Sequence, residues 1–245
     1  MSRYKITIEY DGTPFHGWQR QDGFDTIQQR LEGAIFPIAQ ARVTMYGSGR
    51  TDAGVHALGQ VAHFDLAEDF DCFRLQECMN AHLADVPIAV LSIEKTSGDF
   101  DSRFSALERT YLYKILNRRS KPAIDINRAW HIVQNLDENK MHSAAQHLVG
   151  NHDFSSFRAA GCQSKSPVKT LNSISIRRCA DLIFIEVAAR SFLYRQVRNI
   201  VGSLCLVGGN RWTEQNLIEA FLSKDRTLAG QTAPPYGLYF VGVKY

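Results

Sequence analysis

The chain lacks the features that mark membrane and secreted proteins. It has no apolar run of about 18 residues, and its first segment, MSRYKITIEYDG, is charged from the third residue onward. We therefore expect neither a membrane span nor a secretory leader, and we expect a cytoplasmic location. Its 245 residues suffice for one large domain or two small ones, and 44% hydrophobic with 22% charged residues is typical of a globular protein.

Metal-binding patterns are also missing. The five cysteines include no CxxC pair, and their odd number argues against a disulfide framework, so we expect reduced thiols. His142, His147 and His152 recur every five residues, which spreads them around a helix rather than along one face. Because a metal site needs convergent ligands, we expect no bound metal.

Charge is divided unevenly along the chain. Residues 1–105 contain 9 Lys and Arg against 15 Asp and Glu, whereas residues 106–245 contain 19 against 10. A basic half suits a polyanion, because each Lys or Arg that meets a phosphate releases counterions. A solvated basic face without a partner fits the charge equally well.

Hydrophobic periodicity predicts an α+β fold with two similar halves, 1–105 and 106–245. In the first half, Thr26 and Gln29 form a capping-box pattern that opens a helix. The expected strands are 3–10, 60–65 and 89–95, and the expected helices are 26–38 and 74–83.

The second half repeats this alternation of elements. Its helices are expected from Asp137 to about Val149, from just after Ser191 to Gly208, and from Thr213 to Phe221. Its strands are expected at 109–117, 170–178, 182–188 and 238–243. The similar order of elements indicates a duplicated architecture with a cleft between the halves.

The segment from Gly47 to Gly54 is the most distinctive in the chain. Three glycines within eight residues exclude a regular helix or strand and predict a tight loop that a partner can approach closely. Within it, Arg50 can contact phosphate or stack on a base, and the Asp52 carboxylate can act as nucleophile or base. A hairpin loop whose aspartate caps a turn is the alternative.

This loop, GSGRTDAGVHA at residues 47–57, resembles the signature loop of the TruA-type tRNA pseudouridine synthases. Further blocks similar to that family cover nearly the whole chain in family order. They are YDGTPFHGWQRQ at 10–21, FSA at 104–106, RTYLY at 109–113, HDF at 152–154, SPVKT at 166–170, SFL at 191–193, VRNIVG at 197–202 and APPYGLY at 233–239.

The resemblance implies an isomerase without a cofactor, which breaks the N1–C1′ bond of uridine and rejoins the ribose to C5. It implies that the substrate uridines are at positions 38, 39 and/or 40 in the anticodon stem-loop of tRNA. It also implies a homodimer and a fold of two ferredoxin-like halves, which form a shared, mixed, mainly antiparallel sheet with helices on one side and a central cleft.

The resemblance also assigns roles to individual residues. Asp52 is the catalytic carboxylate, attacking either C6 of the uracil or C1′ of the sugar, and Arg50 occupies the space that the flipped base leaves. Arg198 pairs with that carboxylate and keeps it ionised, and the alternative is a surface arginine. Tyr111 stacks on the uracil, although strand spacing alone favours a core tyrosine. Leu238 matches a position that lines the pocket. The candidate tRNA contacts are Gln19, Arg20, Arg158, Lys165 and Lys169, and the alternative for each is an ordinary surface residue.

Three other functions are consistent with parts of the sequence. A tRNA-binding protein without activity has no need for Asp52, Arg50 and Tyr111 together. A hydrolase that uses Asp52 as general base requires a second carboxylate or a metal, and neither has suitable spacing. A pseudouridine synthase acting on another RNA is the remaining alternative, and the blocks at 18–21 and 109–111 favour the tRNA family.

Overall fold

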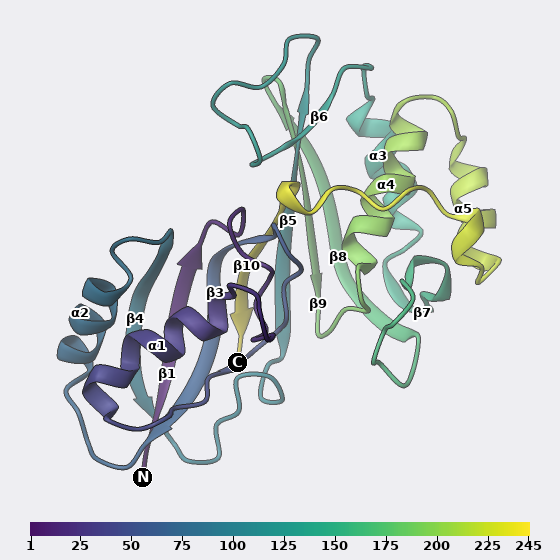
Figure 1. The fold of residues 1–245 in the computed structure, drawn as a ribbon. Coiled ribbons are helices and arrows are strands. Elements are labelled where there is room, and N and C mark those ends of the chain that lie inside the picture. The colour runs from purple at the N-terminus through teal and green to yellow at the C-terminus, as the bar shows by residue number, and fades with distance from the viewer. The chain divides into compact units, whose positions relative to one another are not determined.

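The computed structural model describes all of residues 1–245 and divides them into two compact units (Figure 1). The first unit contains Met1–Leu107 and Tyr239–Tyr245, and the second contains Glu108–Leu238. The closing residues, which the sequence places with the second half, therefore pack within the first unit.

The sheet of the first unit has the strand order β4-β1-β3-β10, and the short strand β2 pairs with β3. Strand β1 is antiparallel to β3 and β4, whereas β10 is parallel to β3. Alternate residues of β1 face the core, where Tyr4, Ile6 and Ile8 are fully buried. The strands are β1 (Ser2–Tyr10), β2 (Tyr46–Gly47), β3 (His56–Leu66), β4 (Ile88–Thr96) and β10 (Leu238–Lys244).

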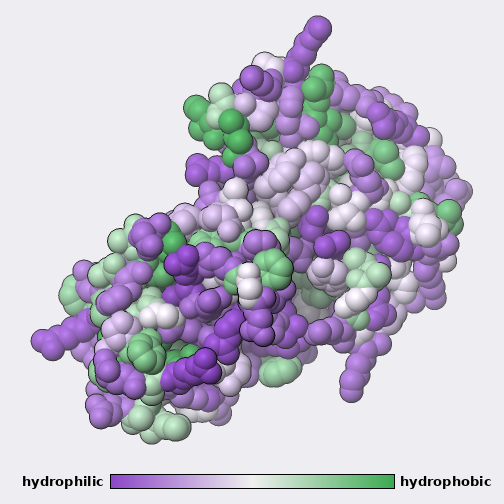
Figure 2. Space-filling view, in the orientation of Figure 1, coloured by the Kyte–Doolittle hydropathy of each residue, from purple (hydrophilic) through white to green (hydrophobic).

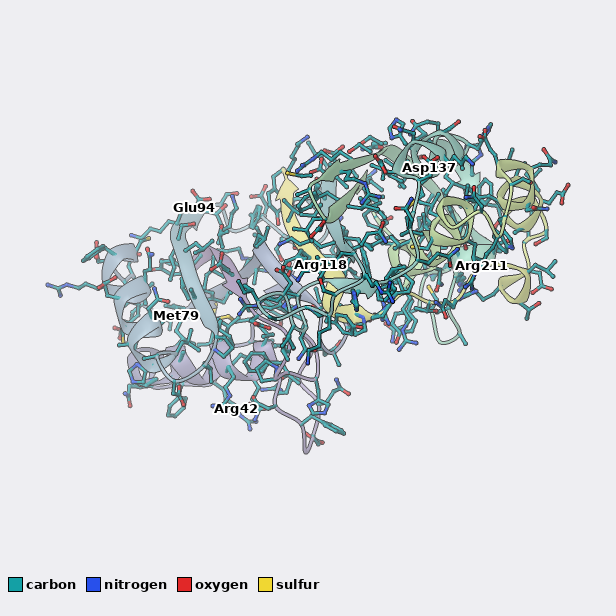
Figure 3. All side chains as sticks on the ribbon, turned by 90° about the horizontal axis from the view of Figure 1, so that it is seen from above. Arg42, Met79, Glu94, Arg118, Asp137 and Arg211 are labelled. Atoms are coloured by element: carbon teal, nitrogen blue, oxygen red, sulfur yellow. The ribbon has the colours of Figure 1, made fainter.

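Two helices pack in the first unit, α1 (Ile27–Ala39) and α2 (Cys72–His82). The predicted start of α1 is confirmed, since the Thr26 side chain accepts a hydrogen bond from the Gln29 amide. Helix α2 lies beside the edge strand β4, and Figure 3 labels Met79 on the helix and Glu94 on the strand.

A bulge in β4 is stabilised by α2. The β1–β4 register shifts between Thr7 and Ile8, which leaves Leu91 unmatched. The Asn80 side chain accepts a hydrogen bond from the Val90 amide at 2.8 Å and donates one to the Val90 carbonyl at 3.0 Å. The helix thus satisfies backbone groups that a bare sheet edge would expose.

The sheet of the second unit has the strand order β5-β9-β8-β7, and β6 pairs with β5 in parallel. The other pairings are antiparallel, so each unit is an α+β unit with mixed, mainly antiparallel strands, as predicted. The short strands β2, β6 and β7 carry no clear alternation and were not predicted. The strands are β5 (Glu108–Asn117), β6 (Trp130–Ile132), β7 (Gly150–Asp153), β8 (Val168–Cys179) and β9 (Leu182–Ala189).

The helices of the second unit are α3 (Glu138–Gln146), α4 (Gln196–Gly208) and α5 (Glu214–Leu222). The predicted caps are confirmed at Asp137 and at Thr213, where Asn216 completes a capping box. The predicted start of α4 just after Ser191 is wrong. Arg195 has a left-handed backbone, with φ of 58°, so the helix begins at Gln196.

Short 3-10 turns connect some of these elements, at Ser155–Phe157, Arg226–Leu228 and Pro235–Gly237. No helix of the structure has the length and apolar character to cross a bilayer. Apolar side chains on the visible face gather in small patches, one of them over the loop between β5 and β6 (Figure 2). In that loop Ile124 is 87% exposed and Ile126 is 57% exposed.

Candidate active site

The loop that carries Asp52 is anchored at its start by the buried side-chain amide of Gln60. The Ser48 amide donates to the Val61 carbonyl at 2.7 Å, and the Ser48 hydroxyl donates to Gln60 Oε1 at 2.6 Å. Gln60 Nε2 then donates to the Gly49 carbonyl at 2.9 Å. Because Gln60 is fully buried, these bonds form out of contact with water and fix the entry of the loop onto β3.

A second anchor holds the residue before Asp52. The hydroxyls of Tyr10 and Thr51 lie 2.8 Å apart, and both side chains are buried. Burial raises the pKa of Tyr10, so this phenol stays neutral and keeps its proton for a hydrogen bond. Strand β1 thereby sets the position of the loop.

The third anchor is the block at residues 12–18. The Trp18 amide donates to the Thr51 carbonyl at 3.0 Å, and the Gly54 amide donates to the Phe15 carbonyl at 3.4 Å. Gly17 has φ of 87°, and a Cβ there would lie 2.5 Å from the Thr51 carbonyl oxygen. Only glycine fits this approach, which explains the glycine before Trp18.

Asp52 is half-buried in this fixed loop, and Arg50 is exposed. The Asp52 carbonyl accepts a hydrogen bond from the Val55 amide at 3.1 Å, which closes a tight turn. The structure therefore presents a carboxylate on a rigid backbone, two residues from an arginine that reaches solvent. Such a group can act as a nucleophile or a base.

The other predicted residues of the first unit differ in their surroundings. Gln19 is exposed. Arg20 is held by an ion pair of 2.7 Å to Glu32, whose side chain is only 7% exposed and also accepts from the Met45 amide. Arg20 therefore already has a structural partner. The Trp18–Thr51 bond joins this block to the Asp52 loop.

Tyr111 lies on β5 of the second unit, opposite Val187 of β9. It is half-buried, and the Phe192 ring meets it edge-on, with centroids 5.1 Å apart and an interplanar angle of 88°. Tyr113, two residues on, is fully buried and donates to the Pro234 carbonyl at 2.8 Å. Of these two tyrosines, Tyr113 is the core residue.

Arg198 lies on α4 and is only 8% exposed, so the alternative of a surface arginine is wrong. Its Nε donates to the Ala233 carbonyl at 2.7 Å, and the Ala233 amide donates back to the Arg198 carbonyl. The segment 233–238, which ends at the buried Leu238, thus contacts both α4 and Tyr113 of β5.

Three further basic residues of the second unit were predicted as tRNA contacts. Lys165 is exposed and Lys169 is half-buried. Arg158 is held by the carbonyls of Cys162 and Ser164, at 3.1 and 2.7 Å, so it shapes its own loop.

Sequence reasoning missed two residues that position the loop, Tyr10 and Gln60. Gln60 lies in a segment that is predicted only as a strand, and Tyr10 ends a predicted strand and begins the block at 10–21, without a predicted role of its own. A polar side chain within an apolar strand is the available signal, because a buried amide or phenol needs a hydrogen-bond partner. Nothing in the sequence identifies that partner as the Asp52 loop.

Potential metal ligands do not converge in this structure. No group of three or more His, Cys, Asp or Glu side chains is arranged to hold a metal ion. His142 accepts from the Ile176 amide, His147 contacts Glu214, and His152 contacts the Val149 carbonyl. The three histidines therefore serve separate structural contacts.

Comparison with known proteins gives a consistent result. A family model described as tRNA pseudouridine synthase matches residues 6–105 and 144–245. Proteins named tRNA pseudouridine synthase A from Brucella ovis, Brucella canis and Brucella melitensis biotype 2 are each 51% identical over 247 residues. These alignments cover 100% of this chain and 98% of each relative. Matches of this extent show that the chain belongs to the tRNA pseudouridine synthase family.

Proposed function

We propose that the chain isomerises uridine to pseudouridine at one or more of positions 38, 39 and 40 in the anticodon stem-loop of tRNA, with Asp52 as the nucleophile. Family membership and the names of the relatives support the reaction and the class of substrate. The observation that carries the residue assignment is the half-buried Asp52 carboxylate on a loop with three anchors.

The chemistry requires a carboxylate that is accessible yet fixed. The target base must leave the helical stack before its ring or C1′ can be reached. Attack by Asp52 forms a bond to C6 or to C1′, the N1–C1′ bond breaks, and C5 bonds to C1′. The bond between Asp52 and C6 or C1′ then breaks, which frees the carboxylate. The C5 proton is then lost and N1 gains a proton, so the product is an isomer of the substrate.

Other residues are proposed to assist Asp52. Arg50, exposed on the same loop, contacts RNA in the space that the base vacates. Tyr111 stacks on the flipped uracil, and Arg198 pairs with the Asp52 carboxylate. The half-burial of Tyr111, the burial of Arg198 and the hydrogen bond from Arg198 Nε to the Ala233 carbonyl support these roles. The family resemblance further supports a homodimer, which analytical ultracentrifugation can test.

The central test is the Asp52→Asn variant. It keeps the shape of the side chain and removes the nucleophile, so tRNA binding should persist while pseudouridine formation falls below detection. Release of tritium from tRNA labelled at uridine C5 measures turnover, and carbodiimide adducts with primer extension identify the modified position.

Asp22→Asn is the matched control, because Asp22 is an exposed aspartate in the same unit. It should retain full activity. Turnover by Asp52→Asn would refute the nucleophile assignment, and tRNA binding without turnover by the unmodified protein would favour the non-catalytic alternative. Turnover on other RNA alone would refute the tRNA assignment.

A further inference from the structure

Two stretches of the second unit contain no acidic residue. Residues 154–180 include five Lys and Arg, and residues 187–213 include four. Each stretch contains a surface segment, the loop 158–167 and the turn 190–195, which we call the loop pair. Three of their basic residues, Lys165, Arg190 and Arg195, are exposed. Exposed basic residues on segments that contain no acidic residue attract phosphate.

The loop pair is fixed internally by hydrogen bonds. The Ala159 amide donates to the Tyr194 carbonyl at 3.1 Å, and the Tyr194 amide donates to Cys162 Sγ at 3.4 Å. Arg158 closes the longer loop through the carbonyls of Cys162 and Ser164. The two segments therefore form one preformed surface, which lies at one end of α4 (Figure 1).

Tyr194 is an aromatic side chain at the surface of this pair. It is 38% exposed, and the Arg195 guanidinium carbon lies 4.8 Å from the centroid of its ring. Exposed aromatic rings with an adjacent arginine are the groups on which unpaired bases stack. Arg195 has a left-handed backbone and caps α4, which begins at the next residue, Gln196.

The same turn also contacts Tyr111. Phe192 meets the Tyr111 ring edge-on at 5.1 Å, and the Arg109 guanidinium donates to the Arg190 carbonyl. Tyr194 is only two residues from Phe192. An RNA strand whose flipped uracil stacked on Tyr111 would therefore have its neighbouring nucleotides within reach of the loop pair.

We propose that the loop pair binds the tRNA nucleotides that flank the target uridine. Tyr194 stacks on an unpaired base, and Lys165, Arg190 and Arg195 contact phosphates. This proposal rests on the proposed function, since it takes tRNA as the substrate and Tyr111 as the residue that stacks on uracil.

The test measures dissociation constants in the Asp52→Asn background, where no turnover occurs, for unmodified tRNA and for its isolated anticodon stem-loop. Tyr194→Ala should raise Kd about 10-fold for both RNAs, as expected for loss of one stacked base, while Tyr194→Phe changes it less than about 2-fold. Asparagine adopts the left-handed backbone readily, so Arg195→Asn should keep the local conformation. It should weaken binding and reduce the slope of log Kd against log salt by about 0.7 to 0.9.

Arg177→Gln is the matched control, because the Arg177 guanidinium carbon lies 4.5 Å from the Phe184 ring elsewhere in the second unit. It should change Kd less than about 2-fold. Circular dichroism checks the fold, and Lys165→Gln with Arg190→Gln tests the phosphate contacts if a variant at Tyr194 or Arg195 does not fold.

Several outcomes would overturn the proposal. The first is an unchanged Kd in the loop-pair variants, and the second is an equal loss of RNA affinity in Arg177→Gln. The third is a loss of affinity for full-length tRNA but not for the isolated stem-loop. The fourth is a change in the sedimentation of the protein without a change in Kd. The last outcome would make the loop pair a contact between copies of the chain. If the Asp52→Asn protein with an intact loop pair binds no tRNA, the proposed function fails first and this proposal fails with it.

Discussion

At the scale of single residues, the Asp52 loop shows which contacts a sequence can predict. Glycine spacing predicts the tight loop, and Thr26 with Gln29 predicts a helix cap, because both depend on neighbours in the chain. The Tyr10–Thr51 bond joins residues 41 positions apart, and the Gln60–Gly49 bond joins residues 11 apart. Such bonds depend on how strands pair, so local patterns do not predict them.

Tyr10→Phe tests whether the second anchor positions the catalytic loop. Losing the hydroxyl leaves Thr51 Oγ1 without this partner and should cost about 1–2 kcal/mol of unfolding free energy. Because catalysis is sensitive to small displacements, kcat should fall about 10-fold with little change in KM. Tritium release and urea denaturation measure the two effects.

Tyr4→Phe is the control for this change. Tyr4 lies on the same strand, is fully buried, and accepts a hydrogen bond from the Phe70 amide at 2.7 Å. Its loss should lower stability comparably without lowering kcat. Equal effects of the two variants on kcat would mean that stability, rather than loop position, limits turnover.

His63 should make the stability of the first unit depend on pH. It is buried, and its Nδ1 accepts from the Ser102 amide at 3.1 Å; burial lowers its pKa. Between the lowered folded pKa and the ordinary value near 6.5, the unfolded chain binds a proton that the folded chain does not. Stability should therefore fall as the pH drops below about 6.5.

His63→Asn keeps an acceptor near the Nδ1 position and does not titrate. The difference in Tm between pH 7.5 and pH 5.5 should shrink in this variant, as followed by circular dichroism. The exposed His16 provides the comparison, and His16→Asn should leave that difference unchanged. An unaltered difference in His63→Asn would assign the acid sensitivity to other groups.

At the scale of elements, helix α4 was predicted by its apolar stripe, yet its polar residues are buried as well. Arg198, Asn199 and Ser203 are each at most 8% exposed. The segment 230–233 covers them, with the Gly230 amide donating to Ser203 Oγ and Thr232 donating to Asn199 Oδ1. Periodicity identifies the apolar face of a helix, but it does not show what covers the opposite one.

Two helical glycines allow this packing to be tested. A Cβ on Gly202 of α4 would lie 1.7 Å from the Gln231 carbonyl oxygen, whereas a Cβ on Gly33 of α1 would meet nothing within 4 Å. Gly202→Ala must displace the covering segment and should lower the unfolding free energy by about 2–4 kcal/mol. Gly33→Ala should raise it by up to about 1 kcal/mol.

Urea denaturation of the two glycine variants gives both values. Because Arg198 binds the Ala233 carbonyl, Gly202→Ala should also reduce pseudouridine formation. A stable and fully active Gly202→Ala protein would show that the covering segment is free to shift.

At the scale of the whole molecule, charge and periodicity predict two α+β halves but assign the last strand to the wrong one. Strand β10 is parallel to β3, with Tyr239 opposite His56 and Phe240 opposite Ala57. Its pattern predicts a strand equally well in either half. Which strand it pairs with depends on contacts across most of the chain, and composition carries no information about them.

Removing Tyr239–Tyr245 should therefore destabilise the first unit, although the deletion lies at the far end of the chain. The deleted residues supply the Lys244 carbonyl that accepts from the Leu107 amide, and the Tyr245 hydroxyl that donates to the Ser102 carbonyl, both at 2.8 Å. They also supply the Tyr239 ring, which stacks on His56 at 4.7 Å.

Hydrogen exchange with mass spectrometry resolves the effect of this deletion by segment. Amides of β3 should exchange faster in the truncated chain, while those of β8 and β9, which pair with each other in the second unit, should keep their protection. Tyr245→Phe removes one hydroxyl and should reproduce only a small part of the change. Faster exchange in β8 and β9 equal to that in β3 would mean that the two units unfold together, and that β10 stabilises the whole chain rather than the first unit.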